Sequence, residues 1–330
     1  MADFSSTLGR GREVAPEGSA GTPSGLGSGV ANRGLRASAA GSVRGVGGRG
    51  RARVRGAHGQ FWSALLTYLV LIAGAALTLA PLIFSLLTSL KTERELALSG
   101  PAALPASADL SNYATLFTDH QFIVPIAVTA QVVAVVTLGQ MVASVLAAYA
   151  FAWLRFPGRE ALFWLYIATM MIPAVVTMIP LFSGLSALGW RNTFAGLVAP
   201  LVLGSPYAIF LLRENFRRVP AEVLDAAKLD GAGPLRTLWS IVLQMNRPIL
   251  ATLFLITVVS QWNNFMWPSV IAPAREWNVM TVATMGLQQQ YSSNWTLVMA
   301  ATTLSILPLI ALFLLFNKQI VRSIGISAVR

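Results

Sequence analysis

Long apolar stretches separated by short polar segments dominate the chain from Phe61 onward. A helix that crosses a membrane needs roughly 20 mainly apolar residues, at a rise of about 1.5 Å per residue. Six stretches meet this requirement, at residues 61–90, 122–151, 161–186, 194–212, 248–271 and 297–316. The pattern therefore predicts an all-α, polytopic membrane protein with six transmembrane helices.

Residues 1–60 break this pattern, since they consist mainly of Gly, Ser, Ala and Arg. Such a segment buries too little apolar surface to offset its ordering entropy, so the sequence predicts a disordered basic tail (1–60) before a transmembrane domain (61–330). The G-x-G-x-x-G match at Gly45–Gly50 follows no strand and is compositional. The basic run Arg44–Arg55 could contact anionic lipid or nucleic acid, or only hold the N-terminus inside. An organelle transit peptide and a start codon assigned too far upstream are further alternatives.

The distribution of Lys and Arg predicts the orientation of the spans. With the N-terminus in the cytoplasm, twenty Lys or Arg residues fall in cytoplasmic segments and four in outer segments. Without the tail the comparison is still eleven to four. The positive-inside rule therefore selects an arrangement with both termini in the cytoplasm. The polar segment 217–234 then faces the cytoplasm, whereas residues 91–121 and 272–296 face outward.

Composition excludes several kinds of chemistry. The chain has 55% hydrophobic and 11% charged residues, no Cys and only two His, so neither a metal centre nor a catalytic site is expected, and no cofactor. No G-x-x-x-x-G-K-[ST] motif is present to bind ATP phosphates. All 13 acidic residues lie in tails, loops or span ends, whereas ion-coupled carriers commonly place carboxylates at mid-membrane. The energy for any transport would therefore come from another protein.

The polar segment between the fourth and fifth stretches has the pattern of a short helix, a tight turn and a second helix start. Pro220 suits a first helical position, and Glu222 and Asp225 lie in the early turns, where the helix dipole favours anions. Asp230-Gly231 ends the helix and Gly233-Pro234 begins the next one. Val223, Ala226 and Ala227 share one small apolar face. The residues alone leave open whether this is an ordinary helical hairpin or a docking element.

Polar and helix-breaking residues inside the spans predict a lined path. Pro173 and Pro180 should kink the third span, and Gly204 and Pro206 the fourth, and transporters use such interrupted helices beside polar cavities. The second span repeats small residues every four positions from Gly139, a face that also suits plain helix packing. The fifth span contains a cluster of amide and aromatic side chains. Amides match sugar hydroxyls, and aromatic rings stack on sugars, so this cluster is a second candidate for lining the solute path. The predicted substrate-path residues are Gln140, Gln261, Trp262, Asn263 and Asn264.

The string Pro-x-Glu-x-x-Asp-Ala-Ala-x-Leu-Asp-Gly-Ala, which starts at Pro220, resembles the EAA loop of permease subunits of ATP-binding-cassette importers. Over residues 61–330 the chain is similar to the second permease of carbohydrate importers of the maltose and glycerol-phosphate type. The motifs that carry this likeness are Ser-Leu-Lys from Ser89, Ala-Tyr-Ala-Phe-Ala-Trp-Leu-Arg-Phe-Pro-Gly-Arg from Ala148, and Trp-Asn-x-Phe-x-x-Pro from Trp262.

The chain departs from that family pattern at four places. Asp225 stands where Glu is usual, and Trp153 where Arg is usual. Val128-Thr129 occupy positions that are often Asn-Ser. Ile241–Gln244 lacks the proline that usually follows Leu. This absence affects how the chain leaves the second helix of the polar segment, the one that begins at Gly233-Pro234.

The resemblance implies a permease of the bacterial inner membrane, not an enzyme. Its partners would be a homologous permease, two ATP-binding-cassette ATPase subunits, an extracytoplasmic substrate-binding protein and the lipid bilayer, with no nucleic acid. The resemblance also implies transport by alternating access, driven by ATPase subunits that bind the 220–232 helix. A stand-alone secondary carrier or channel for small polar solutes is the alternative. The residues implied in coupling are Pro220, Glu222, Asp225, Ala226, Ala227, Asp230, Gly231 and Ala232.

Overall fold

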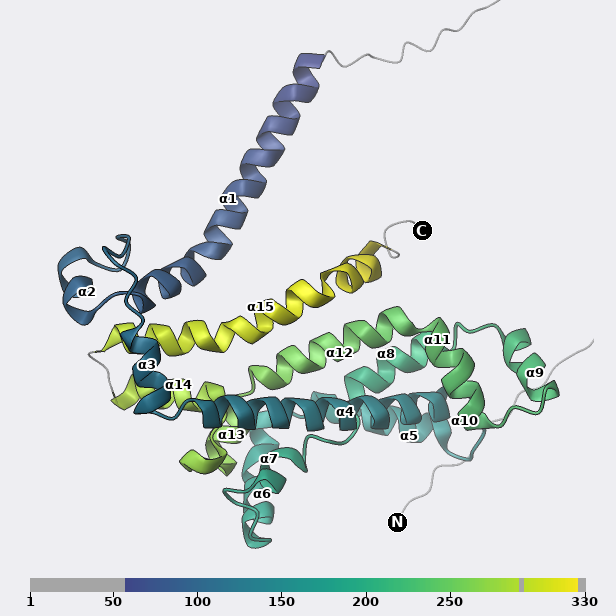
Figure 1. Cartoon of the computed structure of the whole chain (residues 1–330). Coiled ribbons are helices and arrows are strands. Elements are labelled where there is room, and N and C mark those ends of the chain that lie inside the picture. Colours follow the sequence, from purple (N-terminus) through teal and green to yellow (C-terminus); the bar gives the residue numbers. More distant parts are fainter. Residues whose placement is uncertain (1–56, 291–293, 326–330) are drawn as a thin grey trace, which may run out of the picture. The chain divides into compact units, whose positions relative to one another are not determined.

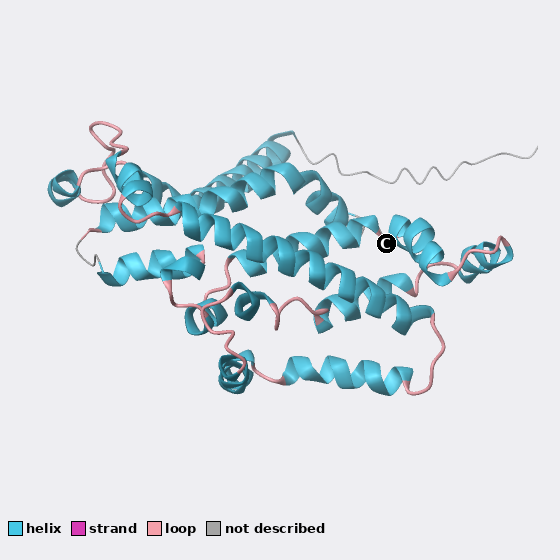
Figure 2. Ribbon diagram, turned by 60° about the horizontal axis from the view of Figure 1, so that its bottom comes forward, coloured by secondary structure: helices cyan, strands magenta, loops and turns pink. Residues whose placement is uncertain are grey.

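The structure is a computed structural model that describes residues 57–290 and 294–325, so most of the predicted tail lies outside the described residues. The chain divides into two units, 1–60 and 61–330. The described part of the second unit is helical throughout and contains no strand (Figures 1 and 2). Its longer helices are α1 (Ala57–Ser89), α4 (Ile123–Trp153), α5 (Arg159–Ala168), α6 (Ala174–Ala187), α8 (Pro206–Phe216), α9 (Ala221–Leu229), α12 (Arg247–Trp262), α14 (Met280–Gln290) and α15 (Trp295–Gly325).

Shorter helical pieces join these helices. They are α2 (Glu93–Ser99), α3 (Ser111–Thr118), η1 (Thr169–Met171), α7 (Phe194–Val198), α10 (Pro234–Thr237), the π-helical turn η2 (Leu238–Val242), α11 (Leu243–Met245), α13 (Met266–Ile271) and η3 (Arg275–Trp277). The prediction of an all-α polytopic protein is confirmed.

Four helical segments of the described chain are long and apolar enough to cross a membrane: Trp62–Ser89, Ile123–Trp153, Arg247–Ile271 and Trp295–Phe316. They correspond to the first, second, fifth and sixth predicted spans. A fifth crossing is counted if the bent pair Arg159–Met171 and Ala174–Ala187 forms one span. The structure therefore differs from the prediction of six continuous spans, and the number of crossings stays a prediction.

The difference arises at the third and fourth predicted spans. The third is bent by 98° where Pro173, which has no N–H to donate, precedes the first residue of α6. The fourth is not one helix: α7 ends at Val198 and α8 begins at Pro206, with Gly204 and Ser205 between them. The interruptions expected at Pro173 and at Gly204-Pro206 are thus present, and the latter divides the predicted span 194–212, whereas Pro180 lies inside α6 without ending it.

Helix α4 lies at the centre of the described fold. Its buried residues occur along nearly the whole helix, from Pro125 to Ala152. It packs mainly against α8 and α12, and α12 packs in turn against α15. Helix α1 is different, because its side chains from Trp62 to Leu79 are all exposed and burial begins only near Ser85. Most of the apolar surface of α1 is therefore uncovered by this chain.

Polar side chains of α4, the second predicted span, form hydrogen bonds with the non-helical segment between α7 and α8. Gln140 Nε2 donates to the carbonyl oxygen of Leu201 at 2.7 Å, and Ser144 Oγ accepts from the backbone N–H of Ser205 at 3.1 Å. The Tyr166 hydroxyl of α5 donates to the carbonyl of Gly204. A backbone that leaves helical geometry within a membrane needs such partners, since water is scarce there.

Gly139 allows this segment to approach α4 closely. A Cβ atom at this position would lie 2.2 Å from Val202 Cγ2 and 2.8 Å from the Val202 carbonyl oxygen. The small-residue repeat of the second span therefore serves packing, which is one of the two readings that the sequence left open.

Candidate functional site

The 220–234 loop contains the predicted helix and turn. Helix α9 begins at Ala221, so Pro220 occupies the N-cap, one position earlier than predicted. At the other end Gly231 adopts φ +76°, the left-handed conformation that glycine adopts without steric cost. The N–H groups of Gly231 and Ala232 donate to the carbonyls of Lys228 and Ala227 at 3.0 and 2.9 Å. This pair of bonds is a Schellman motif, which closes the helix.

Two faces of α9 have different environments. Leu224 is buried in one hydrophobic cluster with Val219, which precedes the N-cap, and with residues of α4, α8 and α12, and Ala227 is also buried. Val219 and Leu224 stand in the positions of a hydrophobic staple, which fixes the direction in which the chain enters the helix. The predicted apolar face of Val223, Ala226 and Ala227 is therefore wrong in one member, because Ala227 points into the protein.

The opposite face of α9 is open. Glu222, Val223, Asp225, Ala226 and Asp230 are exposed, and Leu229 keeps 90% of its surface accessible. The one ion pair of this face joins Lys228 Nζ to Asp225 Oδ1 at 2.8 Å, between two largely exposed side chains. Figure 1 shows α9 as a short helix set apart from α10 and α11 by loops. Exposed apolar side chains among carboxylates are typical of a surface that receives a partner.

A buried arginine joins three helices shortly before the start of α9. Arg213, near the end of α8, is 2% exposed, and its guanidinium forms an ion pair with Glu160 at the start of α5. Arg213 Nε also donates to the carbonyl oxygen of Phe151 at 3.3 Å, and the guanidinium lies 3.8 Å from the centre of the Phe163 ring. Helices α4, α5 and α8 therefore meet at one charge, which lies six residues before Val219 and eight before the first residue of α9.

Two further contacts hold the ends of the loop. Trp153 Nε1 donates to the carbonyl of Phe216 at 3.0 Å, which gives the residue that replaces the usual Arg a structural role. On the exit side no break occurs at Ile241–Gln244, where the usual proline is absent. The helix instead continues through the π-helical turn η2 and α11, and it ends at the buried Asn246, whose Nδ2 donates to Val242 at 2.8 Å.

A second candidate site is a cavity where three helix interruptions converge. Its volume is about 500 Å³. One wall comes from the start of α6 after Pro173, another from the segment between α7 and α8, and a third from the gap between α12 and α13. The lining residues are Ala174, Val175, Thr177, Met178, Leu181, Pro200, Leu201, Asn264, Met266 and Trp267.

The predicted path residues separate in the structure. Asn264 lines this cavity, and Gln261 lies within 3.5 Å of its amide. Gln140 does not line the cavity itself, but its Nε2 donates to the carbonyl of Leu201, which does. Asn263 is exposed elsewhere, and its Nδ2 donates to the Val259 carbonyl one turn earlier.

Trp262 does not line the cavity. It is buried against Val133 and Val258, and its indole N–H donates to the Ser305 carbonyl at 3.0 Å. Trp262 instead lines a separate, mainly apolar cavity of about 370 Å³ between α4, α12 and α15, so its place on the solute path stays a prediction. Its amphipathic ring is satisfied within the protein, and the same is true of Trp267, whose Nε1 donates to the Gly196 carbonyl at 3.1 Å.

Sequence reasoning missed Thr177, Met178 and Met266 as cavity residues. The signal that could have found the first two was the proline pair around them, since Pro173 and Pro180 predict an interruption and cavities form beside interruptions. No local pattern distinguishes Met266.

Comparison with known proteins decides what kind of protein this is. Residues 140–326 match the family described as "Binding-protein-dependent transport system inner membrane component". The chain belongs to this family. The match covers more than half of the chain and contains α9, its turn and the exit helix.

Named relatives agree with this assignment. The sn-glycerol-3-phosphate transport system permease protein UgpE of Yersinia enterocolitica is 37% identical over 194 residues, which cover 57% of this chain and 68% of the relative. UgpE of Escherichia coli is 29% identical over 279 residues, or 80% of this chain and 96% of the relative. The structure of a bacterial ABC transporter involved in the import of alginate matches with a TM-score of 0.69 at 24% identity, over 80% of this chain and 98% of that one. This last likeness concerns the fold.

Family membership confirms the resemblance proposed from the 220–232 motif. The chain is a permease subunit of a binding-protein-dependent importer and not an enzyme, and ATP hydrolysis takes place in a separate subunit. It is a multi-pass component of a membrane.

Proposed function

We propose that this permease forms half of the translocation path for a sugar or sugar-like solute in the inner membrane of a bacterium. A homologous permease would supply the other half, two ATPase subunits would drive transport, and an extracytoplasmic binding protein would deliver the solute. The relatives named for sn-glycerol 3-phosphate and the importer of alginate support a hydroxylated solute. The exposed apolar surface of α1, from Trp62 to Leu79, is a suitable contact for the second permease.

Coupling through α9 is the part of the proposal that the geometry supports best. The outer face of α9 carries Glu222, Asp225, Ala226 and Asp230, and its inner face is fixed in the core by Leu224. Because Leu224 is buried in one cluster with residues of α4, α8 and α12, a movement of α9 would be transmitted to these helices through that contact. When ATPase subunits close around it, the motion passes into the helices whose interruptions line the 500 Å³ cavity. The cavity would then open alternately to the two sides of the membrane.

Substitution at Gly231 tests this coupling. In the assembled importer, Gly231→Asp should abolish ATP-driven uptake while the protein still inserts and the ATPase still turns over, because a side chain at φ +76° strains the turn that closes α9. Ala226→Glu should give the same result through charge and bulk on the exposed face. Uptake into proteoliposomes and phosphate release are measured in parallel.

Gly189→Asp is the matched control. Gly189 also has a positive φ, +74°, and an added Cβ meets nothing within 4 Å, but the residue lies outside the 220–234 loop. The two aspartates therefore cost similar backbone strain, and only the one at Gly231 should stop uptake. Normal uptake in both Gly231→Asp and Ala226→Glu would rule out coupling through α9. Solute movement by the solitary chain in liposomes without ATP would restore the carrier or channel alternative.

A further inference from the structure

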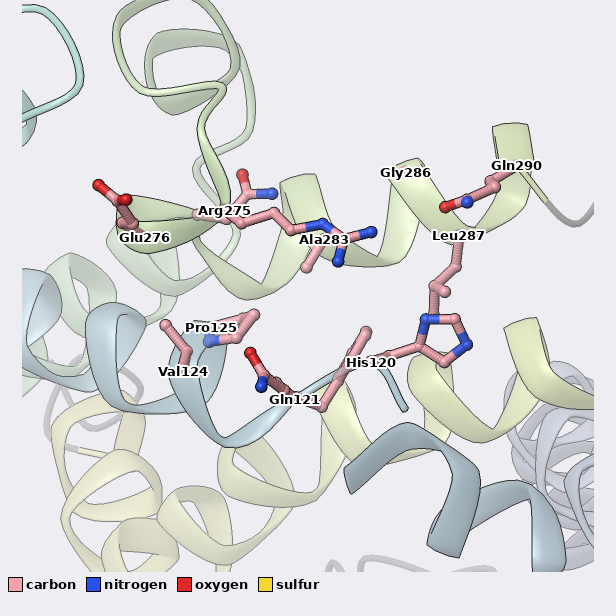
Figure 3. A pocket seen from close by; sticks show the side chains of 12 residues that line it. His120, Gln121, Val124, Pro125, Arg275, Glu276, Ala283, Gly286, Leu287 and Gln290 are labelled. Atoms are coloured by element: carbon pink, nitrogen blue, oxygen red, sulfur yellow. The ribbon is translucent and has the colours of Figure 1, made fainter. Parts of the chain in front are cut away.

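A second polar cavity lies at the end of α4 opposite α9. The α9 end of α4 is marked by Val145–Ala152, which pack with Leu224, whereas the other end is joined to α14 by a bond from Met280 N–H to Thr129 Oγ1 at 2.7 Å. The cavity has a volume of about 260 Å³. Its walls come from the junction of α3 and α4, from η3 and from α14 (Figure 3).

The cavity has an apolar floor and a polar rim. Phe122 and Leu287 are buried in the cluster that joins α3, α4, α14 and α15, so the floor belongs to the core. Gln121, Arg275 and Gln290 stand on the rim. Small-molecule sites typically combine an apolar surface with a few converging polar groups in this way.

Two polar groups of this cavity lack a partner within the described chain. The Oδ1 atom of Asn278 is buried and accepts no hydrogen bond. Arg275 takes part in none of the ion pairs of the described residues. Figure 3 shows its guanidinium extended alongside Ala283, while the carboxylate of the adjacent Glu276 points the other way. A buried acceptor without a donor is costly, and an unpaired guanidinium favours an anion.

The backbone holds this arrangement in place before any ligand arrives. Gln121 adopts φ 52°, which a residue with a side chain rarely does, and such strain concentrates at functional positions. The N–H of Phe122, the next residue, donates to the Leu116 carbonyl at 3.0 Å. The cavity is therefore preorganised at the point where its floor and rim meet.

We propose that this cavity binds a small solute that carries hydroxyl groups and one anionic group. Arg275 would pair with the anionic group, and the hydroxyl groups would meet the polar side chains of Gln121 and Gln290 on the rim. The volume lies just below the range of about 300–1,000 Å³ that is typical of ligand sites, so the cavity accepts one sugar or polyol unit rather than a chain of them. The proposal rests on the importer function and its orientation, which place the cavity at the outer entrance to the path.

Solute binding to the full-length chain in lipid nanodiscs, without ATPase or binding protein, tests the proposal. The probes are glycerol 3-phosphate and its uncharged analogue glycerol, measured by titration calorimetry. Glycerol 3-phosphate should bind more tightly. Arg275→Gln should weaken its binding about tenfold, as expected for the loss of a charge-assisted contact, and should leave glycerol unchanged. Arg94→Gln, which removes another outer arginine, should have no effect.

Gly286→Leu blocks the cavity without removing any polar group. An added Cβ at Gly286 meets nothing within 4 Å, so Gly286→Ala is tolerated and serves as the control, whereas the leucine side chain fills the space. Leucine should abolish binding and alanine should preserve it. The proposal is overturned if glycerol 3-phosphate does not bind, or if its binding survives both Arg275→Gln and Gly286→Leu. Because the binding assay uses no ATP, a failure of coupling through α9 would not change its result. Conversely, a failure of the solute to bind in this cavity would not change the result of the coupling test.

Discussion

The buried guanidinium of Arg213 allows a quantitative test of how the start of α9 is held. Its charge is met by the Glu160 carboxylate, and the Glu214 carboxylate lies 3.7 Å away. Glu160→Gln removes the nearer carboxylate with little change of shape and leaves the cation at 2% exposure. Leaving a buried charge without its partner is far more costly than deleting the whole pair.

The structure sets the size of the effect. Breaking a fully buried pair costs about 3–5 kcal/mol. The Glu160 side chain is 50% exposed and Glu214 remains nearby, so the cost falls below that range, and Glu160→Gln should lower the free energy of unfolding by about 2–3 kcal/mol. Arg213→Met leaves only a half-exposed carboxylate and the Phe151 carbonyl without their partner, at about 1–2 kcal/mol. The double variant should therefore be more stable than Glu160→Gln alone.

The free energy of unfolding is measured in mixed micelles for the unmodified chain, the two single variants and the double variant, which completes the double-mutant cycle. Thermal midpoints give an independent ranking of stability. The prediction concerns the order as much as the size: Glu160→Gln is the least stable, and adding Arg213→Met to it recovers stability. Losses that simply add would refute the argument that the pair matters through the buried charge. In the assembled importer Glu160→Gln should also reduce uptake per ATP hydrolysed, because α8 leads directly into α9.

Two further predictions concern packing and orientation. Gly139→Val should lower the free energy of unfolding by at least about 1–3 kcal/mol in the same assay, because an added Cβ overlaps Val202, while Gly184→Val, where it meets nothing within 4 Å, should cost less. Because the chain has no Cys, single variants Asp230→Cys and Glu276→Cys can be labelled in intact spheroplasts with an impermeant maleimide. Only the cysteine at 276 should react, and labelling at 230 instead would reverse the orientation.

Features governed by neighbouring residues could be predicted from the sequence. The helix at 221–229 and its turn follow from Pro220, Asp230 and Gly231, since caps and turns depend on a few adjacent residues. The interruptions at Pro173 and Pro206 follow from the missing N–H of proline. The hydrophobic periodicity could not show that 194–212 would divide, because apolar content does not reveal where the helix ends.

The path residues show where local reasoning stops. Asn263 and Asn264 are adjacent and chemically identical, yet one amide bonds back to Val259 and the other lines a cavity. What separates them is the break after Trp262, where α12 ends and Asn264 comes to line the cavity together with residues of α6. The indole N–H of Trp262 is satisfied by a carbonyl 43 residues away, at Ser305. Non-local partners of this kind decide whether a polar residue in a membrane helix is satisfied within the protein or available to a solute.

The same reasoning supports the proposed role of the helix interruptions in transport. A continuous helix satisfies its own backbone, so it needs no polar partner and can pack anywhere along an apolar neighbour. The segment between α7 and α8 has lost that independence and relies on Gln140, Ser144 and Tyr166. Those three side chains come from α4 and α5, which Arg213 joins to α8, the helix that precedes α9. We therefore expect movement of α9 to disturb the bonds that shape the cavity wall, although the two sites lie apart.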